Sequence, residues 1–527
     1  MDGRWIIGLV ATLLVISECS AAAEGPEGQA EALVARLIRP DRQAVEILHL
    51  FEGARWSHPA AALSAWRSRS PQSTPGKAIE ALIASFNPEM VREWRCMDRA
   101  ELRIGVAPST GEIGWAVLVP HDDGTLAAGV TAIRLTNPED LPIRSGDRSI
   151  PVARIGRAGV PMACQVGGSV VVAGSREWLQ RGVAIVRERG GPSSALGESI
   201  DSGFVFRIEP ARLPSAKSGS LDLRRVVEAI RAMGCGPIDG RAFIKDGAFV
   251  LDVSARFEGR ASIERGVEPA WLESVPTAGA MAAFSIALDP DASGWDRAFA
   301  LADRVERVDP ARAALAPLRT RLNLLALASG VRWESELRPH LLGISGCILG
   351  VPDRPGKVSG ILIVLHLDDA ATANSVARRA SLRLSSLAIE THDREIRVGW
   401  GQTSRRWVGE RPAAGESLSA LMKTPDLGGA LPMPRRIVAA WPGRILRPTG
   451  AIARAGQTLA DDPPIIWSGW DLFGRTHDVA RWNGLGDRVR RFLAAMLGDE
   501  AIEAAGTRPE VRVRGTAFPD AQGGIAD

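Results

Sequence analysis

The sequence predicts an α+β protein built from repeated units, each a strand followed by one or two helices and an antiparallel hairpin. Three observations predict this class. Two stretches of the chain match at a constant interval, several apolar runs of strand length precede helical periodicity, and Asp246-Gly247 lies between two apolar runs as in a tight hairpin. Helices packed on antiparallel sheets would bury the apolar faces of both.

The match between two distant stretches is the main signal of repetition. Residues 114–123 read GWAVLVPHDD and residues 360–369 read GILIVLHLDD, and they are preceded by AELRIGVAP at 100–108 and GCILGVPD at 346–353. The interval is 245 residues for the equivalent valines (351 − 106) and for the equivalent histidines (366 − 121). An interval shared by several features is typical of internal duplication.

The match continues further along the chain with a shorter interval. SVVVAGSREWL at 169–179 corresponds to IRVGWGQTSRRWV at 396–408, where the two tryptophans are 229 residues apart (407 − 178). We therefore predict one topology for the two long stretches, with 114–120 and 360–366 as equivalent strands.

Apolar runs of strand length open the expected units. Each ends in proline, glycine or an acidic residue, as strands do before a turn, and they lie at 44–52, 203–210, 282–290 and 437–445. Helical periodicity follows and predicts helices at 58–69, 77–86, 222–232, 295–305 and 312–328. Strands then return, as at 240–257, where Asp246-Gly247 forms the turn of a hairpin.

Gly, Pro and Ser collect at 189–203, 258–278 and 410–433, which are typical boundary segments. The predicted organisation therefore has five parts: a signal peptide at 1–23, a first long α+β unit at 24–195, a short α+β unit at 196–275, a second long unit at 276–425, and a C-terminal α+β unit at 426–527 with a disordered tail.

The N-terminal segment predicts export. Arg4 supplies a short positive region, Trp5 to Ile16 is a 12-residue run with one polar residue, and small residues end at Ala21-Ala22-Ala23. The run is too short for a membrane-spanning helix. A lipoprotein is not expected because Glu18, rather than a small residue, precedes Cys19. The alternative is a buried N-terminal helix. We expect a periplasmic or extracellular protein.

Signal cleavage would leave Cys96, Cys164, Cys235 and Cys347. An exported protein can form disulfides. The spacings are wide and no Cys-x-x-Cys motif occurs, so the sequence indicates no zinc ribbon, thioredoxin motif or c-type haem site. The disulfide status of the four cysteines stays open.

The composition argues against a dedicated nucleic-acid binder. The 527 residues carry 64 basic and 61 acidic side chains, a net charge of +3. The sequence contains no run of 18 apolar residues, so we expect no transmembrane helix. Arginine far exceeds lysine and tyrosine is absent, which indicates a GC-rich genome rather than phosphate binding.

The signal peptide, the repeated units and the His-x-Asp-Asp strand ends resemble large exported proteins of unknown function from planctomycete bacteria. The resemblance extends over most of the mature chain and includes tryptophan-bearing helices that close the units. It implies export and an α+β repeat fold, and it brings no active-site residues.

Two strand ends combine histidine with carboxylates, namely His121-Asp122-Asp123 and His366-Leu-Asp368-Asp369. Such pairs are potential metal ligands. Asp368 or Asp369 directly precedes a helical stretch, however, and an aspartate there is typical of a helix N-cap. We predict capping at this position and no metal site.

Other motifs are incomplete. The Asp289-Pro-Asp291 stretch begins like a calcium loop, but position 12 is Ala300 instead of glutamate. Gly484-Leu-Gly486 lacks the third glycine of a dinucleotide fingerprint, no Walker A motif occurs, and the segment around Ser345 is short of a nucleophile elbow. We therefore predict no catalytic, cofactor-binding or metal-binding residues. A Ser-His-Asp triad assembled in space stays open, because triads need no proximity in sequence.

Three functions remain in view. The first is an exported non-catalytic protein, structural or binding, so that an enzyme is not expected. The second is an exported hydrolase with a spatially assembled site, for which clustered titratable residues in a pocket would be evidence. The third is carbohydrate or peptide binding through exposed tryptophans, of which the chain has 15 in all.

Overall fold

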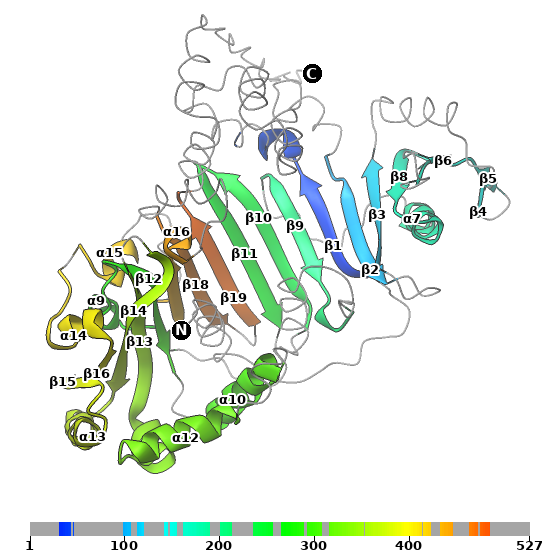
Figure 1. Cartoon of the computed structure of the whole chain (residues 1–527). Coiled ribbons are helices and arrows are strands. Elements are labelled where there is room, and N and C mark those ends of the chain that lie inside the picture. The colour runs from blue at the N-terminus through cyan, green and yellow to red at the C-terminus, as the bar shows by residue number, and fades with distance from the viewer. Residues whose placement is uncertain are drawn as a thin grey trace, which may run out of the picture.

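One large antiparallel sheet dominates the protein (Figure 1). The computed structural model describes residues 31–43, 46, 98–106, 113–120, 142–145, 148–154, 162–189, 201–212, 236–256, 265–288, 292–307, 316–351, 354–413, 415–422, 433–445, 463–472 and 475–484. Within these residues, antiparallel pairings join the strands in one series that begins at β6 (Ala153–Arg154) and ends at β15 (Ala388–His392).

The sheet has two halves. In the first, the strands follow the spatial order β6 (Ala153–Arg154), β7 (Met162–Val166), β8 (Ser169–Ala173), β3 (Ile113–Pro120), β2 (Glu101–Val106), β1 (Glu31–Ile38), β9 (Gly203–Ile208), β10 (Ile238–Lys245) and β11 (Ala248–Arg256). A separate ribbon pairs β4 (Ile143–Ser145) with β5 (Arg148–Ile150).

The second half continues from β11 in the order β19 (Arg475–Trp482), β18 (Ile465–Leu472), β17 (Arg436–Ala440), β12 (Ala280–Ala287), β13 (Leu341–Val351), β14 (Arg354–Leu367), β16 (Glu395–Trp400) and β15 (Ala388–His392). All of these pairings are antiparallel.

The predicted fold class, with repeated strand–helix–helix–hairpin units, is wrong. The apolar runs at 203–210, 282–290 and 437–445 do contain strands, but these strands pair across the expected unit boundaries. β1 pairs with β9 and β11 pairs with β19, so strands that are far apart in the sequence form hydrogen bonds to each other within one sheet. Unpaired strand edges are exposed hydrogen-bonding groups, and one continuous sheet removes nearly all of them.

The two halves have the same strand order. β7-β8-β3-β2-β1-β9-β10-β11 corresponds position by position to β15-β16-β14-β13-β12-β17-β18-β19, so that β3 and β14, the strands expected to be equivalent, take the same place. The register corresponds as well. Val34 in β1 pairs with Arg103 in β2 and Arg207 in β9, and in the same way Ala282 in β12 pairs with Ile348 in β13 and Ala440 in β17. The equivalent strands β11 and β19 join the halves, which places a local two-fold relation at the centre of the sheet.

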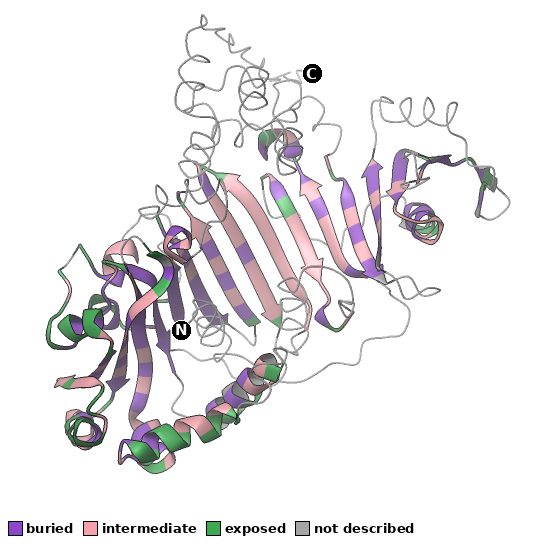
Figure 2. Ribbon diagram, viewed as in Figure 1, coloured by how far each residue is buried: buried purple, intermediate pink, exposed green. Residues whose placement is uncertain are grey.

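Helices cover both faces of the second half (Figure 2). One face packs against α9 (Pro269–Glu273), α14 (Gln402–Gly409) and α15 (Leu418–Met422). The other packs against α10 (Ala292–Arg307), α12 (Leu318–Ala328), the π-helical turn η2 (Trp333–Leu337) and α13 (Ala370–Arg383). Every residue of β12 is buried, as expected for a strand between two covered faces.

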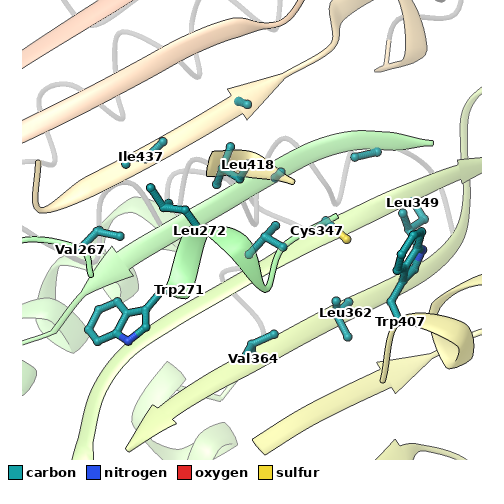
Figure 3. Packing of buried hydrophobic residues seen from close by; sticks show 14 of the residues in the cluster. Val267, Trp271, Leu272, Cys347, Leu349, Leu362, Val364, Trp407, Leu418 and Ile437 are labelled. Atoms are coloured by element: carbon teal, nitrogen blue, oxygen red, sulfur yellow. The ribbon is translucent and has the colours of Figure 1, made fainter. Parts of the chain in front are cut away.

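Further short elements are η1 (Pro210–Arg212), η3 (Arg338–His340) and α16 (Pro442–Ile445), and in the first half α7 (Arg176–Arg189) follows β8 as α14 follows β16. Trp178 in α7 and Trp407 in α14 are both buried against the sheet. Figure 3 shows Trp407 beside Leu349 and Leu362 in the core on the α9 side.

Local sequence signals define several boundaries as expected. The hairpin β10–β11 turns at Asp246-Gly247, where both residues have positive φ, the conformation that a tight two-residue turn requires. The helices expected at 295–305 and 312–328 correspond to α10 and α12, and α12 runs from Pro317 to a Ser329-Gly330 end. Of the strand expected at 44–52 the structure describes residue 46 alone, which is helical, and the helices expected at 58–69, 77–86 and 222–232 lie outside the described residues.

Charged residues of β10, β11 and β19 pair with one another at the junction between the halves. The carboxylate of Asp252 in β11 lies 2.6 Å from Nε2 of His477 in β19 and accepts a 2.7 Å bond from Arg241 in β10. The hydrogen bond to Asp252 raises the pKa of His477, and burial opposes it only in part. Burial would raise the pKa of Asp252, but the hydrogen bond and charge of His477, with those of Arg241, outweigh it and lower this pKa.

We expect this pair to make the stability of the protein depend on pH. The His477 contribution is complete below the usual histidine pKa of about 6.5 and disappears as the pH rises through the raised folded value. The Asp252 contribution is present above about pH 4 and disappears as the pH falls through the lowered folded value. The free energy of unfolding, measured with urea, should fall as the pH rises from 6 to 9, and His477→Gln should make this fall smaller. An identical pH profile in the variant would contradict this account.

Candidate functional site

A row of buried polar side chains crosses the sheet on the α9 side. Oγ of Ser285 in β12 lies 2.7 Å from Oγ of Ser345 in β13, which lies 2.8 Å from Nε2 of His366 in β14. Nδ1 of His366 faces the Glu395 carboxylate of β16 at 3.5 Å, and Glu395 accepts a 3.0 Å bond from Arg397. The order serine, histidine, glutamate is that of a hydrolytic triad.

Trp271 of α9 closes this row. Its ring stacks on His366 with centroids 4.6 Å apart and planes 11° apart. It also lies over Gly343, where a Cβ would be 2.4 Å from the indole, so that only glycine permits this position of the ring. Ser285 and Ser345 are fully buried and His366 is 2% exposed, which leaves no approach for a substrate in this structure.

The electrostatics of the row fit a structural role. Burial lowers the pKa of His366 more than the nearby Glu395 raises it, so the imidazole is neutral at neutral pH. His366 Nδ1 lies 3.5 Å from the Glu395 carboxylate, which is longer than the hydrogen bond that orients the base of a triad. The backbone of Ser345 is also paired in mid-strand with Ser285 and Val364, so it does not offer the free amides of an oxyanion hole.

The other face of the same strands borders a large apolar cavity. Its volume is about 480 Å³, and it lies between strands β12 to β16 on one side and α10, α12, η2 and α13 on the other. Of its lining residues, only Glu306, Arg321 and Ser329 are polar or charged. Native cores rarely leave voids larger than a water molecule, whereas sites for small molecules enclose about 300–1,000 Å³.

Sequence and packing create this cavity together. β12 and β14 present Phe284, Ile286 and Leu365 at every second position, because side chains alternate between the faces of a strand. Aromatic rings line the helical side, where Trp295 and Trp333 meet edge to face with centroids 5.1 Å apart. The rings and the sheet leave a space that the helices do not fill.

Three hydrogen-bond donors on the cavity wall lack acceptors. Nε1 of Trp295, Nε1 of Trp333 and Nε of Arg321 are buried and have no hydrogen-bond partner among the residues that the structure describes. Another nitrogen of the Arg321 guanidinium forms an ion pair with Glu306. Buried donors are nearly always paired in folded proteins, so three unpaired ones beside a cavity point to an acceptor that enters it.

The cavity reaches the surface between the C-terminal ends of α12 and α13. Leu325 lines the cavity and is 56% exposed, and Leu384 and Leu387 line the same region behind α13. The Arg383 guanidinium lies close to the end of α12, about 3 Å from the place of a Cβ on Gly330. The cavity therefore meets the surface at Leu325.

One of the two aspartates at the second strand end caps a helix, as predicted from the sequence. Asp369 caps α13 and accepts bonds from the amides of Ala371 at 3.2 Å and Thr372 at 2.7 Å. Asp368 pairs with Nδ1 of His340 at 2.8 Å, whereas His366 is buried in the polar row. The structure thus separates the three residues of this motif.

Several other candidate residues lie outside the described residues, namely His121, Asp122, Asp123, Asp289, Asp291 and Gly486. Within the described residues, no group of three or more His, Cys, Asp or Glu side chains is placed to hold a metal ion. None of the helices in this part of the chain is long and apolar enough to cross a membrane.

The described cysteines and tryptophans are mostly in the core. Cys164 and Cys347 are free thiols, and burial raises the pKa of each to about 12. Cys96 and Cys235 lie outside the described residues. Among the described tryptophans, Trp400 is the one with an exposed side chain, at 38%.

No pattern in the sequence indicated the cavity itself. Its lining residues come from five strands and several helices, and each of these elements has an ordinary apolar pattern in the sequence. The one available signal was α12, whose sequence LRTRLNLLALA carries leucines on more than one side of the helix.

Comparisons with known proteins do not identify the chain. No family model and no curated protein matches it. Two solved structures, crystal forms III and I of a protein described as TP0453, align with TM-scores of 0.22 and 0.19 at 6% and 8% identity. The alignments cover 48% of this chain and 82% and 80% of those chains. Likeness at this level says nothing about fold or function.

Proposed function

We propose that the protein is an exported, non-catalytic binding protein whose cavity holds one apolar ligand. The observation that carries this proposal is the cavity of about 480 Å³ with an almost entirely apolar wall. An empty apolar cavity of this size forfeits packing contacts along its whole lining, and water gains little there because it finds few polar partners. An apolar ligand restores the contacts.

The unpaired donors narrow the class of ligand. A molecule with an acceptor at one end would satisfy Trp295, Trp333 or Arg321 while its apolar part fills the space along the sheet. A carboxylate suits this position best, because a hydrogen bond to a charged group is stronger than a neutral one. The expected ligand is therefore an amphiphile of the long-chain fatty acid type.

The buried polar row gives the hydrolase alternative less support. Ser345 is fully buried, Trp271 stacks on His366, and the cavity lies on the opposite face of the sheet. Binding of carbohydrate through tryptophans has little support from the described residues, where most rings are buried.

A titration with a fluorescent polyunsaturated fatty acid tests the proposal. The purified chain should bind one molecule per chain in a saturable manner. A hydrocarbon of equal length without the carboxylate should compete about tenfold less well, because it cannot pair with the buried donors. Unsaturable binding, or the absence of binding by either molecule, would contradict the proposed function.

A further inference from the structure

The opening of the cavity is surrounded by exposed leucines. Seven large apolar side chains are exposed in the described part of the chain, and four of them lie on the two helices at this opening. They are Leu324, Leu325, Leu327 and Leu382, with exposed fractions of 58%, 56%, 65% and 78%. Scattered single leucines are ordinary on a protein surface, but a group beside an apolar cavity marks an interaction site.

The same helices carry positive charge without compensation by acidic residues in their own segments. Residues 316–333 and 370–389 contain no Asp or Glu, and each segment carries three arginines. Arg319, Arg321 and Arg379 pair with acids from other segments. Arg378 and Arg383 are exposed, and no ion pair to either is present among the described residues.

We infer that α12 and the C-terminal end of α13 dock on an anionic lipid bilayer, and that the cavity exchanges its ligand there. This inference rests on the proposed function. Leucines flanked by arginines on a short helix are the features of a segment that lies in a membrane interface, where the leucines enter the acyl region and the arginines contact the headgroups. The contact would carry an apolar ligand between bilayer and cavity without exposure to water.

Charge favours a bilayer over a second copy of the chain as the occupant of this surface. Two copies joined symmetrically through the patch would bring Arg378 and Arg383 of each close to arginines of the other, because a symmetric contact meets its own residues. An anionic surface instead attracts each arginine. The leucines are covered in either arrangement, so the arginines decide between them.

Vesicle binding by the full chain provides the test. The protein should float with vesicles that contain anionic phosphatidylglycerol and much less with neutral phosphatidylcholine vesicles. Leu324→Asp with Leu327→Asp should reduce binding about tenfold, and Arg378→Glu with Arg383→Glu should weaken it about fivefold per arginine. Arg405→Glu, an exposed change on α14 across the sheet, is the control that should bind as the unaltered chain does.

Hydrogen exchange shows whether binding uses this surface. Anionic vesicles should slow exchange at 318–330 and 378–387 and leave β9 unchanged. Binding that persists in both double variants, without protection at these segments, would overturn the inference, as would a dimer in solution that the leucine variant dissociates. Leu324 and Leu327 do not line the cavity, so fatty acid binding in solution should survive their replacement. Loss of vesicle binding with retained ligand binding therefore separates this inference from the proposed function.

Discussion

Replacement of Arg436 by leucine is expected to cost about 3–5 kcal/mol in the free energy of unfolding, because it leaves the buried Asp478 carboxylate without its arginine partner. Arg436 donates to both oxygens of Asp478 at 2.7 Å and to Asp471 at 3.2 Å. The side chains of Arg436 and Asp471 are each 2% exposed. Urea unfolding of the variant and the unaltered protein measures the difference.

An exposed arginine gives the matched control. Arg406 pairs with Glu410 one helical turn away, and both side chains are more than 60% exposed, at 67% and 62%. Arg406→Leu should change the free energy of unfolding by about 0.5 kcal/mol or less, because exposed pairs contribute little. Equal effects of the two substitutions would show that Arg436 is not the buried centre of an ionic cluster.

The register of three strands explains how this cluster fits. Arg436 in β17, Gly469 in β18 and Asp478 in β19 lie side by side. A Cβ on Gly469 would be 2.2 Å from the Asp478 carboxylate and 2.3 Å from Nε of Arg436. Glycine therefore leaves the space in which the ion pair crosses the central strand.

Ala326→Trp should abolish fatty acid binding, with an affinity loss of about a hundredfold or more, because the indole occupies space that the ligand needs. Ala326 is 8% exposed on α12 and lines the cavity. The fluorescence titration that detects the ligand in the unaltered protein measures the loss.

The same helix supplies the control for this substitution. Ala328 is exposed and does not line the cavity, so Ala328→Trp should bind the fatty acid as the unaltered chain does. Circular dichroism establishes that both variants are folded. Retained binding in Ala326→Trp would place the ligand elsewhere.

Local features of the fold could be predicted from sequence. The Asp246-Gly247 turn, the cap at Asp369 and the strands at 203–208 and 280–287 each follow from a few adjacent residues. The partners of those strands could not be predicted in this way. β1 has the same local pattern whether it pairs with β2 alone or also with β9, and long-range pairing depends on the whole sheet.

The candidate site could not be predicted from the sequence for a similar reason. Sequence motifs identify polar groups that act together, whereas this cavity is an absence of packing among apolar residues from distant segments. The unpaired state of Trp295 and Trp333 is a property of their surroundings. Spacing in the sequence carries neither fact.

The correspondence between the halves adds an evolutionary reading. We propose that the chain arose by duplication of an eight-stranded unit whose two copies remain joined through β11 and β19. The shared strand order and the matching register of β1 and β12 support this proposal.

Analysis of molecules bound to the purified protein tests the central claim most directly. Solvent extracts of the unaltered chain, of Ala328→Trp and of Ala326→Trp, each taken after incubation with mixed fatty acids and gel filtration, are compared by mass spectrometry. The account predicts about one fatty acid per chain in the first two proteins and almost none in Ala326→Trp. Equal amounts in all three proteins, or none in the unaltered chain, would contradict it.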